Sequence, residues 1–387
     1  MNGVQIGESG VYIHVPFCER LCPYCDFAVS VQAEIPHREY GAALMAELDR
    51  RQGELGSRKV GTIYFGGGTP SLLAPEILNE LVERVGSIFE MASNVEVTLE
   101  ANPNQITGER LEQWREGGIN RLSIGCQSFQ DRHLKALRRN HDSAMAREAV
   151  SLAMKKMKRV SLDLMFAGPS QSKKEWEEDL EVLRELAEEG LDHLSGYNLT
   201  IEEGTAFWIR RKRGTVVVPG EEVAAEMLEG LVEVATSVGL KRYEVSNFAV
   251  PGGESRHNSG YWRGRPYLGV GMGAHSLEVL SDGSARRRAN SRRYGEYMAG
   301  AKATVEELSP EAHFGERLFL GVRSSFGLDL DALQGQFGAK VGEEAFHRAE
   351  VELRALAEEG LLARDGRRFW PTNRGLNVSD GLAARLI

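Results

Sequence analysis

Three cysteines stand close together near the start of the chain, at Cys18, Cys22 and Cys25. They are three of only four cysteines in 387 residues, so thiols are concentrated in one short segment. Thiolates are preferred protein ligands of soft metals, chiefly zinc, copper(I) and the irons of iron–sulfur clusters. A [4Fe–4S] cluster normally takes four cysteines, so three leave one iron open for another ligand. The segment therefore predicts an iron–sulfur cluster that takes part in binding or chemistry.

Two other interpretations of these cysteines stay open. A structural zinc site needs a closed set of four ligands, so His14, His37 or the distant Cys126 would have to supply the fourth. Disulfides are disfavoured because the clustered cysteines are odd in number and the first residues lack the pattern of a secretion signal. Cys126 ends the apolar run Leu122–Cys126, where we expect a small buried residue rather than a ligand.

Short apolar runs alternate with helical patterns along the first half of the chain. The runs predict strands over Val11–Val15, Gly61–Phe65, Val95–Glu100, Arg121–Gly125, Val160–Met165 and His193–Asn198. Helices are predicted between them over Arg38–Gln52, Pro75–Phe89, Thr107–Glu116, Ser143–Met157 and Lys173–Glu189. This alternation is typical of six βα units around a parallel sheet. Chemistry in such sheets lies at the carboxyl ends of the strands, and the cysteine segment directly follows the first of them.

The pattern changes after Asn198. We expect a helix over Glu221–Ser237 and strands over Arg242–Ser246 and Tyr267–Met272. Further helices are predicted over Pro310–Gly321, Leu330–Phe337 and Glu343–Glu359, followed by a short hairpin. This order is typical of a small winged-helix-like domain, although its long acidic helix argues against DNA binding. We therefore expect a main domain over 1–240, a connecting region over 241–308 and a C-terminal domain over 309–387.

The composition limits the classes of partner. The net charge of −9 argues against bulk electrostatic binding to nucleic acid or to anionic membranes. No apolar run approaches the roughly 18 residues of a transmembrane helix, so we expect a cytoplasmic protein. Basic clusters at Arg210–Arg213, Arg286–Arg288 and Arg292–Arg293 are interpreted as solvated surface, with an anion-binding rim as the alternative.

Glycine or polar residues also follow the other predicted strands. The glycine run Gly66–Gly68 follows the second strand, where exposed backbone N–H groups could bind a carboxylate or phosphate. Glu100 ends the third strand and could hold an ammonium group or ribose hydroxyls. Gln127 follows the fourth, and Asp163 lies within an apolar strand, where a carboxylate is seldom buried without a partner. Together these residues predict a binding site at one edge of the sheet.

The spacing Cys-x₃-Cys-x₂-Cys, with an aromatic residue before the last cysteine, resembles the signature of the radical S-adenosylmethionine (SAM) superfamily. The resemblance covers nearly the whole chain and is closest to the HemN family of coproporphyrinogen III dehydrogenases, in particular to its HemW branch of haem chaperones. The segments that carry it are Tyr12–Cys18, Gly66–Pro70, Glu100–Pro103 and Gln127–Phe129. It implies an α/β fold, an open (β/α)6 partial TIM barrel with a C-terminal helical, winged-helix-like domain.

The resemblance also implies roles for individual residues. Cys18, Cys22 and Cys25 would hold a [4Fe–4S] cluster, whose open iron is chelated by SAM in that superfamily. The residues implied to line the SAM site are Tyr12, Tyr24, Gly67, Gly68, Thr69, Glu100, Gln127, Arg139, Asp163, Leu199 and Ala274. Arg139 is preferred to Arg138 because of its Arg-x-His spacing to His141, although the glycine that usually precedes this arginine in the family is missing.

Three features favour the haem chaperone branch over the dehydrogenase. Only 17 residues precede Cys18, whereas the dehydrogenase has a longer N-terminal segment. Asp26-Phe27 stand where the dehydrogenase has Gly-Cys. The chaperone branch carries a His-Asn-x-x-Tyr-Trp motif, which His257–Trp262 matches. A histidine can ligate haem iron and aromatic rings can cover a porphyrin, so the match implies haem contacts from His257, Tyr261 and Trp262. A surface loop anchored by the aromatics is the alternative.

The resemblance thus implies a radical-SAM-type haem chaperone that uses the cluster and SAM, binds haem and transfers it to haemoproteins such as respiratory enzymes. An electron donor and a homodimer are also implied, and nucleic acid is not expected as a partner. One alternative is an oxygen-independent coproporphyrinogen III dehydrogenase, in which arginines would hold substrate carboxylates. Another is a radical SAM enzyme acting on tRNA, against which the net charge and the lack of a recognisable RNA-binding module count.

Overall fold

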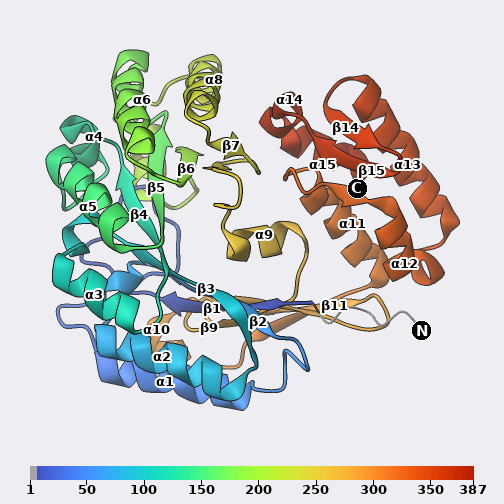
Figure 1. Cartoon of the computed structure of the whole chain (residues 1–387), viewed down its shortest axis with the longest axis horizontal. Coiled ribbons are helices and arrows are strands. Elements are labelled where there is room, and N and C mark those ends of the chain that lie inside the picture. The colour runs from blue at the N-terminus through green and yellow to red at the C-terminus, as the bar shows by residue number, and fades with distance from the viewer. Residues whose placement is uncertain (1–6) are drawn as a thin grey trace.

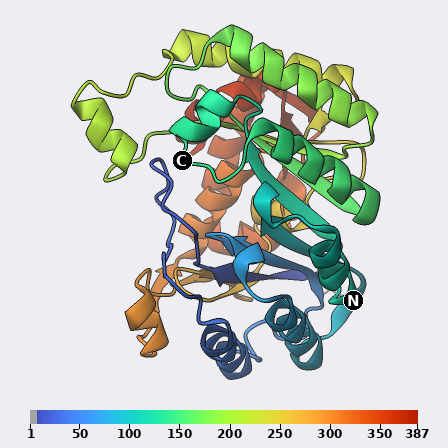
Figure 2. The ribbon, with the colours of Figure 1, turned by 90° about the vertical axis from the view of Figure 1, so that its left-hand side faces the viewer.

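The computed structural model describes residues 7–387. Its main body is a twelve-stranded sheet with the order β12-β11-β10-β9-β1-β2-β3-β4-β5-β6-β8-β7. The central strands β1 to β6 are parallel. They span Ser9–Val15, Val60–Gly67, Met91–Ala101, Arg121–Gln127, Arg159–Phe166 and His193–Asn198. The sheet curves without closing on itself, so the described residues form an open partial barrel (Figures 1 and 2).

Helices cover the outer face of this sheet (Figure 2). They are α1 (His37–Arg50), α2 (Pro75–Ile88), α3 (Gly108–Glu116), α4 (Asp131–Ala136), α5 (Ser143–Lys156), α6 (Lys173–Glu188) and α8 (Glu221–Ser237). Helix α7 (Ala206–Lys212) instead packs beside the cysteine segment, where the N–H of Phe207 donates to the carbonyl of Pro23 at 2.8 Å. Apolar residues at helical spacing give them a buried side, as with Ile77, Leu81 and Val85 in α2. The main core lies between the helices and the sheet and includes the buried Trp114 and Trp176. The strand–helix alternation predicted from the sequence is confirmed.

The region 241–308 extends both edges of the sheet instead of only connecting two domains. Its strands are β7 (Lys241–Arg242), β8 (Asn247–Ala249), β9 (Tyr267–Val270), β10 (His275–Val279), β11 (Ala285–Ala289) and β12 (Thr304–Leu308). Its helices are α9 (Arg256–Trp262) and α10 (Tyr294–Met298). The strand expected over Arg242–Ser246 is wrong beyond its first residue: Arg242 ends β7, and the chain then turns toward β8. The Glu244 carboxylate accepts the N–H of Ser246 at 2.9 Å and stabilises this turn.

The C-terminal part has its own core and packs beside the open barrel (Figure 1). Its elements are α11 (Pro310–Gly321), β13 (Leu328–Asp329), α12 (Leu330–Val341), α13 (Glu343–Glu358), β14 (Leu362–Asp365), β15 (Arg368–Pro371), α14 (Asn373–Asn377) and α15 (Ser379–Leu386). The three strands form a small sheet in the order β13-β15-β14. Arg287 of β11 pairs with Glu316 of α11 at 2.6 Å and joins the two parts. Across the described residues, no helix has the length and apolarity that a bilayer crossing requires.

The arginines of β11 are engaged in ion pairs. Arg286 pairs with Glu278 at 3.0 Å and with Glu307 at 2.8 Å, both on neighbouring strands. Arg287 similarly contacts Glu306 at 2.9 Å, in addition to its pair with α11. Cross-strand pairs of this kind stabilise a sheet edge only modestly. These contacts favour the interpretation of this cluster as structural surface.

Candidate cofactor-binding site

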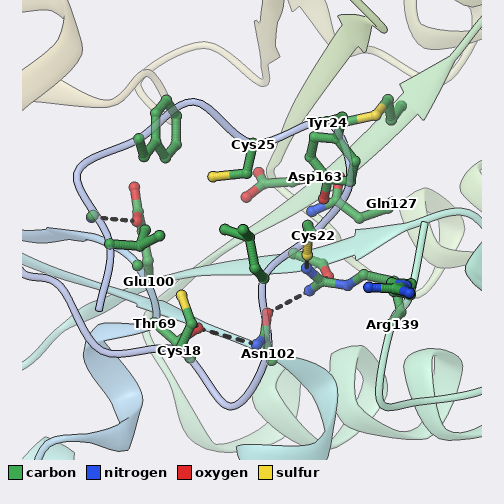
Figure 3. A pocket seen from close by; sticks show the side chains of 18 of the residues that line it. Cys18, Cys22, Tyr24, Cys25, Thr69, Glu100, Asn102, Gln127, Arg139 and Asp163 are labelled. Carbon is green, nitrogen blue, oxygen red and sulfur yellow. Dashed lines mark hydrogen bonds between the residues drawn. The ribbon is translucent and has the colours of Figure 1, made fainter. Parts of the chain in front are cut away.

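A pocket of about 370 Å³ opens at the carboxyl ends of the central parallel strands. Loops that follow consecutive strands of the sheet supply its walls, as the arrangement of parallel strands requires. Figure 3 shows the three cysteines around the same space as Glu100 and Asp163. Residues expected at the SAM site that line this pocket are Tyr24, Gly67, Gly68, Thr69, Glu100, Gln127, Arg139, Asp163 and Leu199.

Hydrogen bonds hold the cysteine loop at both of its ends. The N–H of Cys18 donates to the carbonyl of Ser30 at 3.1 Å, and the N–H of Ser30 donates to the carbonyl of Pro16 at 2.7 Å. His14 Nε2 lies 2.7 Å from the carbonyl oxygen of Ala28, further along the loop. Burial lowers the pKa of His14 to about 4, so the ring is neutral and donates this hydrogen bond. His14 therefore anchors the loop and is not available as a fourth metal ligand.

The cysteine thiols suit a cluster better than a single ion. Within residues 7–387, no three histidine, cysteine or acidic side chains are placed to hold one metal ion. A cubane cluster has no such requirement, because each thiolate binds a different iron. Burial, with contributions from the nearby Cys25 and Cys22, raises the pKa of Cys18 to about 11. Three adjacent thiolates thus need a positive group between them, and the irons of a cluster would provide it.

A chain of hydrogen bonds ties the cysteines to the neighbouring loops (Figure 3). Arg139 Nη1 lies 3.9 Å from the sulfur of Cys22, and Nη2 donates to the carbonyl of Gly125 at 2.7 Å and to Asn102. Asn102 Nδ2 donates to Thr69 Oγ1 at 3.3 Å, and Thr69 Oγ1 donates to the sulfur of Cys18 at 3.8 Å. This chain brings the guanidinium charge of Arg139 close to the sulfur atoms, where it would stabilise thiolates.

The choice between Arg138 and Arg139 has a geometric answer. Both line the pocket, but the contact with Cys22 comes from Arg139, while Arg138 is exposed. Arg138 also has a φ of 57°, a left-handed conformation that bulky residues rarely adopt. This turn directs the next residue, Arg139, into the pocket.

Glu100, the last residue but one of β3, is deeply set in the pocket. Its carboxylate accepts hydrogen bonds from the Tyr64 hydroxyl at 2.8 Å and from the Gly67 N–H at 3.1 Å. Burial raises the pKa of Glu100 to about 7, and the negative charge of Asp163 adds to this effect. The Gly67 N–H is thus already occupied by Glu100 and is not free to bind a ligand carboxylate. A cationic group of a ligand, such as an ammonium, would relieve the cost of ionising Glu100.

Asp163 on β5 is surrounded by hydroxyl donors. Ser123 Oγ donates to it at 2.9 Å and Ser161 Oγ at 3.1 Å. Burial raises the pKa of Asp163, and the serine hydrogen bonds oppose that effect. Gln127, at the end of β4, has a φ of 72°, a strained conformation often found at binding sites. The Asp163 carboxylate is therefore held by hydrogen bonds at the wall of the pocket, and Gln127 lines the same wall.

Gly68 allows the loop after β2 to approach the cysteine loop closely. A Cβ atom at this position would lie 2.6 Å from the carbonyl oxygen of Pro16 and 2.7 Å from that of Phe17. Gly68→Ala should therefore displace the chain just before Cys18, at a cost of about 1–3 kcal/mol in stability. We expect the variant to retain less iron after reconstitution, as measured by iron analysis and urea unfolding. Gly53→Ala is the matched control because nothing lies within 4 Å of its Cβ; equal iron and stability in the two variants would refute this steric role.

Two expected SAM-site residues do not line the pocket. Tyr12 lies on β1, where its ring stacks on Tyr64 at 6.1 Å and its hydroxyl is 3.1 Å from His14 Nδ1. Ala274 is buried in the turn after β9, and its N–H donates to the carbonyl of Gly271 at 3.2 Å. Both positions support neighbouring segments of the barrel.

Other pocket residues escaped the sequence analysis. Ser123 and Tyr197 line the pocket together with Asn102, which lies inside a motif but was not assigned a role. Ser123 is two residues before Gly125 and four before Gln127 on the same strand, and all three face the pocket. The two-residue period of a strand was the signal that could have revealed Ser123.

His257 does not face a haem-sized space. It is 3% exposed, its Nδ1 lies 2.7 Å from Thr62 Oγ1, and its Nε2 lies 2.8 Å from the Tyr261 hydroxyl. Its ring stacks on Tyr64 at 5.0 Å, and the adjoining cavity measures only about 20 Å³. Burial lowers the pKa of His257 to about 3, so the ring is neutral.

Helix α9, which carries this motif, closes the amino-terminal end of the barrel (Figure 1). It contacts β1 and β2 near their first residues, opposite the cysteine pocket. The motif is therefore neither a surface loop nor an open haem site in this arrangement. Both ring nitrogens of His257 are hydrogen-bonded within the protein, which leaves neither free to ligate iron. Trp262 is half-buried at the last position of the same helix.

Comparisons with known proteins agree with this architecture. Residues 12–183 match the radical SAM superfamily, and residues 308–378 match the HemN C-terminal domain. The solved structure of coproporphyrinogen III oxidase (HemN) from Escherichia coli has a TM-score of 0.80 and 21% identity to this chain. It covers 98% of this chain and 90% of its own, so the two proteins share a fold.

Sequence similarity to curated proteins is higher. The heme chaperone HemW of Mycobacterium tuberculosis is 36% identical over 389 residues, which cover 98% of this chain and 94% of that protein. The heme chaperone HemW of Escherichia coli is 37% identical over 299 residues, or 77% of each chain. That of Lactococcus lactis is 30% identical and covers 98% of this chain and 97% of its own. The chain therefore belongs to the HemW family of radical SAM proteins.

Proposed function

We propose that this protein is a radical-SAM-type haem chaperone that binds haem and transfers it to haemoproteins. The observation that carries the proposal is the set of three thiols around a pocket of about 370 Å³, in a chain similar to HemW proteins over almost its whole length. Recipients such as respiratory enzymes, an electron donor, a homodimeric state and a cytoplasmic location belong to the same proposal.

In this proposal Cys18, Cys22 and Cys25 hold a [4Fe–4S] cluster, which when bound supplies one electron and an open iron for SAM. Arg139 offsets the negative charge of the thiolates. Glu100 accepts from the SAM ammonium group. The remaining SAM contacts are proposed for Tyr24, Gly67, Gly68, Thr69, Gln127, Asp163 and Leu199, all of which line the pocket.

Haem contact is proposed at the mouth of this pocket. Leu21 and Phe27, which line the pocket, are 52% and 65% exposed, which is unusual for large apolar side chains in one short loop. A porphyrin face could cover them and remove their apolar surface from water. Ligation of haem iron by His257 would require α9 to leave the end of the barrel, because both ring nitrogens of His257 are hydrogen-bonded within the protein. Haem contacts by Tyr261 and Trp262 are proposed from the motif alone.

The experiment that tests the function compares two substrates under anaerobic conditions. The reconstituted protein is offered haem or coproporphyrinogen III in separate tubes, with SAM and a reductant. We expect haem to remain bound through gel filtration, as followed by its spectrum, and chromatography to detect no protoporphyrinogen. Turnover of coproporphyrinogen without retention of haem would instead identify the biosynthetic dehydrogenase.

A further inference from the structure

A line of hydrogen bonds runs beneath the pocket and ends at Asp163. Tyr243 Oη lies 2.8 Å from His193 Nε2, and His193 Nδ1 lies 2.7 Å from Ser161 Oγ. Ser161 Oγ is in turn 3.1 Å from Asp163 Oδ1. His193, Ser161 and Tyr243 are all buried, with 4% exposure or less. The line therefore connects Tyr243 to a carboxylate at the pocket wall through buried side chains.

The donors and acceptors along this line fit only one direction if Asp163 is ionised. A carboxylate only accepts, so Ser161 must donate its single proton to Asp163 and accept from His193 Nδ1–H. Burial and the positive charge of Arg121 lower the pKa of His193 well below its usual value, so the ring is neutral. Its Nε2 then carries no proton and accepts from the Tyr243 hydroxyl. Each bond in such a line polarises the next.

Tyr243 stands where three parts of the molecule meet. Its hydroxyl oxygen accepts the N–H of Ser255 at 3.3 Å, and Ser255 is the N-cap residue of α9. Its backbone carbonyl accepts the N–H of Ser325 at 2.8 Å, and its ring lies 6.3 Å from that of Phe326 in the C-terminal part. The position of Tyr243 is thus fixed by α9 and by the C-terminal part together.

A small polar cavity borders the line. It measures about 40 Å³, enough for about one water molecule, and is lined by His193, Asp163 and Glu100 among others. Asp163 and Glu100 also line the large pocket, so both sites share these carboxylates. The floor of the pocket is therefore polar and ordered by buried donors.

We propose that Tyr243 and His193 are positioning residues that, through Ser161, hold the Asp163 carboxylate ionised and oriented toward bound SAM. The proposal rests on the proposed function in one respect, the contact of Asp163 with SAM. Through this line of hydrogen bonds, α9 and the C-terminal part are connected to the cofactor pocket, because both fix the position of Tyr243.

The first readout is the tautomer of His193 and does not depend on any cofactor. The full chain is labelled with ¹⁵N-histidine, and the His193 signal is assigned by its absence from His193→Asn. We expect the proton on Nδ1 in the parent protein. In Ser161→Ala the Nδ1–H loses its acceptor, so we expect the proton to move to Nε2. A parent protein with His193 protonated on Nε2 would overturn the proposed direction.

The second readout is the SAM dissociation constant of the anaerobically reconstituted protein, measured by equilibrium dialysis. Tyr243→Phe removes only the hydroxyl group. We expect Tyr243→Phe and Ser161→Ala each to weaken SAM binding about three- to tenfold. Tyr297→Phe is the matched control: it also loses a partly buried side-chain hydrogen bond, that of its hydroxyl to Glu47 at 2.9 Å, but it lies outside the line that ends at Asp163. We expect its affinity to stay within about twofold of the parent.

The outcomes separate this inference from the proposed function. Equal SAM affinity in Tyr243→Phe and Tyr297→Phe, with normal binding by the parent, would refute the positioning role alone. Failure of the parent itself to bind SAM would refute the assigned SAM site, whatever the tautomer of His193. Thermal unfolding of each variant tests whether a weaker affinity reflects loss of the fold, and Ser161→Ala provides a second break in the line if Tyr243→Phe is unstable.

Discussion

Replacing Cys22 by alanine should leave the reconstituted protein without its iron–sulfur cluster. Only two thiolates would remain for a cluster that takes three from this chain, and the positive charge of Arg139 would lie beside the missing thiolate. We expect the iron content to fall from about four per protein to nearly zero, together with loss of the visible absorbance of the cluster. Iron and sulfide analysis after anaerobic reconstitution gives the measurement.

Cys126→Ala is the matched control for this change. Cys126 is fully buried behind the sheet, with its sulfur 4.0 Å from the carbonyl oxygen of Ala146. Its replacement removes a thiol of the same chain without touching the pocket, so the cluster content should stay that of the parent. A cluster that persists undiminished in Cys22→Ala would contradict the ligand assignment, and a cluster lost from both variants would mean that Cys126 is a ligand or that the fold is damaged.

Glu100→Gln should weaken SAM binding by about 10- to 100-fold, because a charged hydrogen bond to the ammonium group is replaced by a neutral one. The same variant should change the pH dependence. Burial raises the pKa of Glu100 to about 7, with Asp163 raising it further and the Tyr64 hydrogen bond lowering it. Glu100 is therefore protonated below this pH and must lose a proton before it can hold an ammonium group.

The affinity of the parent protein for SAM should decrease as the pH falls. In the parent protein the affinity for SAM should fall by up to about tenfold per pH unit below about pH 7, and it should level off above. The part of this pH dependence that is due to Glu100 should vanish in Glu100→Gln. Glu90 is exposed, so Glu90→Gln should keep the pH dependence of the parent. Equilibrium dialysis between about pH 6 and pH 8 gives the comparison. Identical slopes in the parent and in Glu100→Gln would show that Glu100 does not titrate in SAM binding.

Much of the fold and of the pocket is predictable from the sequence because its signals are local. The apolar runs predict β1 to β6, and the carboxyl ends of parallel strands necessarily lie at one edge. Glu100 and Gln127 could therefore be expected near the cysteines, and both line the pocket. The resemblance added Arg139, whose position in an irregular segment after α4 has no periodic signal.

What the sequence did not predict depends on contacts between distant residues. His257 was interpreted through its motif, yet its burial results from Thr62 and Tyr64, almost two hundred positions earlier. The short strands β9 to β12 have too little periodicity to show that they join the β1 edge. His193 and Ser161 stand in apolar strands, where nothing local shows that they share a hydrogen bond.

Haem transfer to a haem-free respiratory haemoprotein tests the proposed function most directly. The protein is loaded with haem, freed of excess by gel filtration and mixed with the recipient under anaerobic conditions, with cluster and SAM present. We expect the recipient spectrum to appear as the donor spectrum fades, and faster than with the same amount of free haem. Haem that stays on the donor, or that reaches the recipient no faster than free haem does, would contradict a chaperone role.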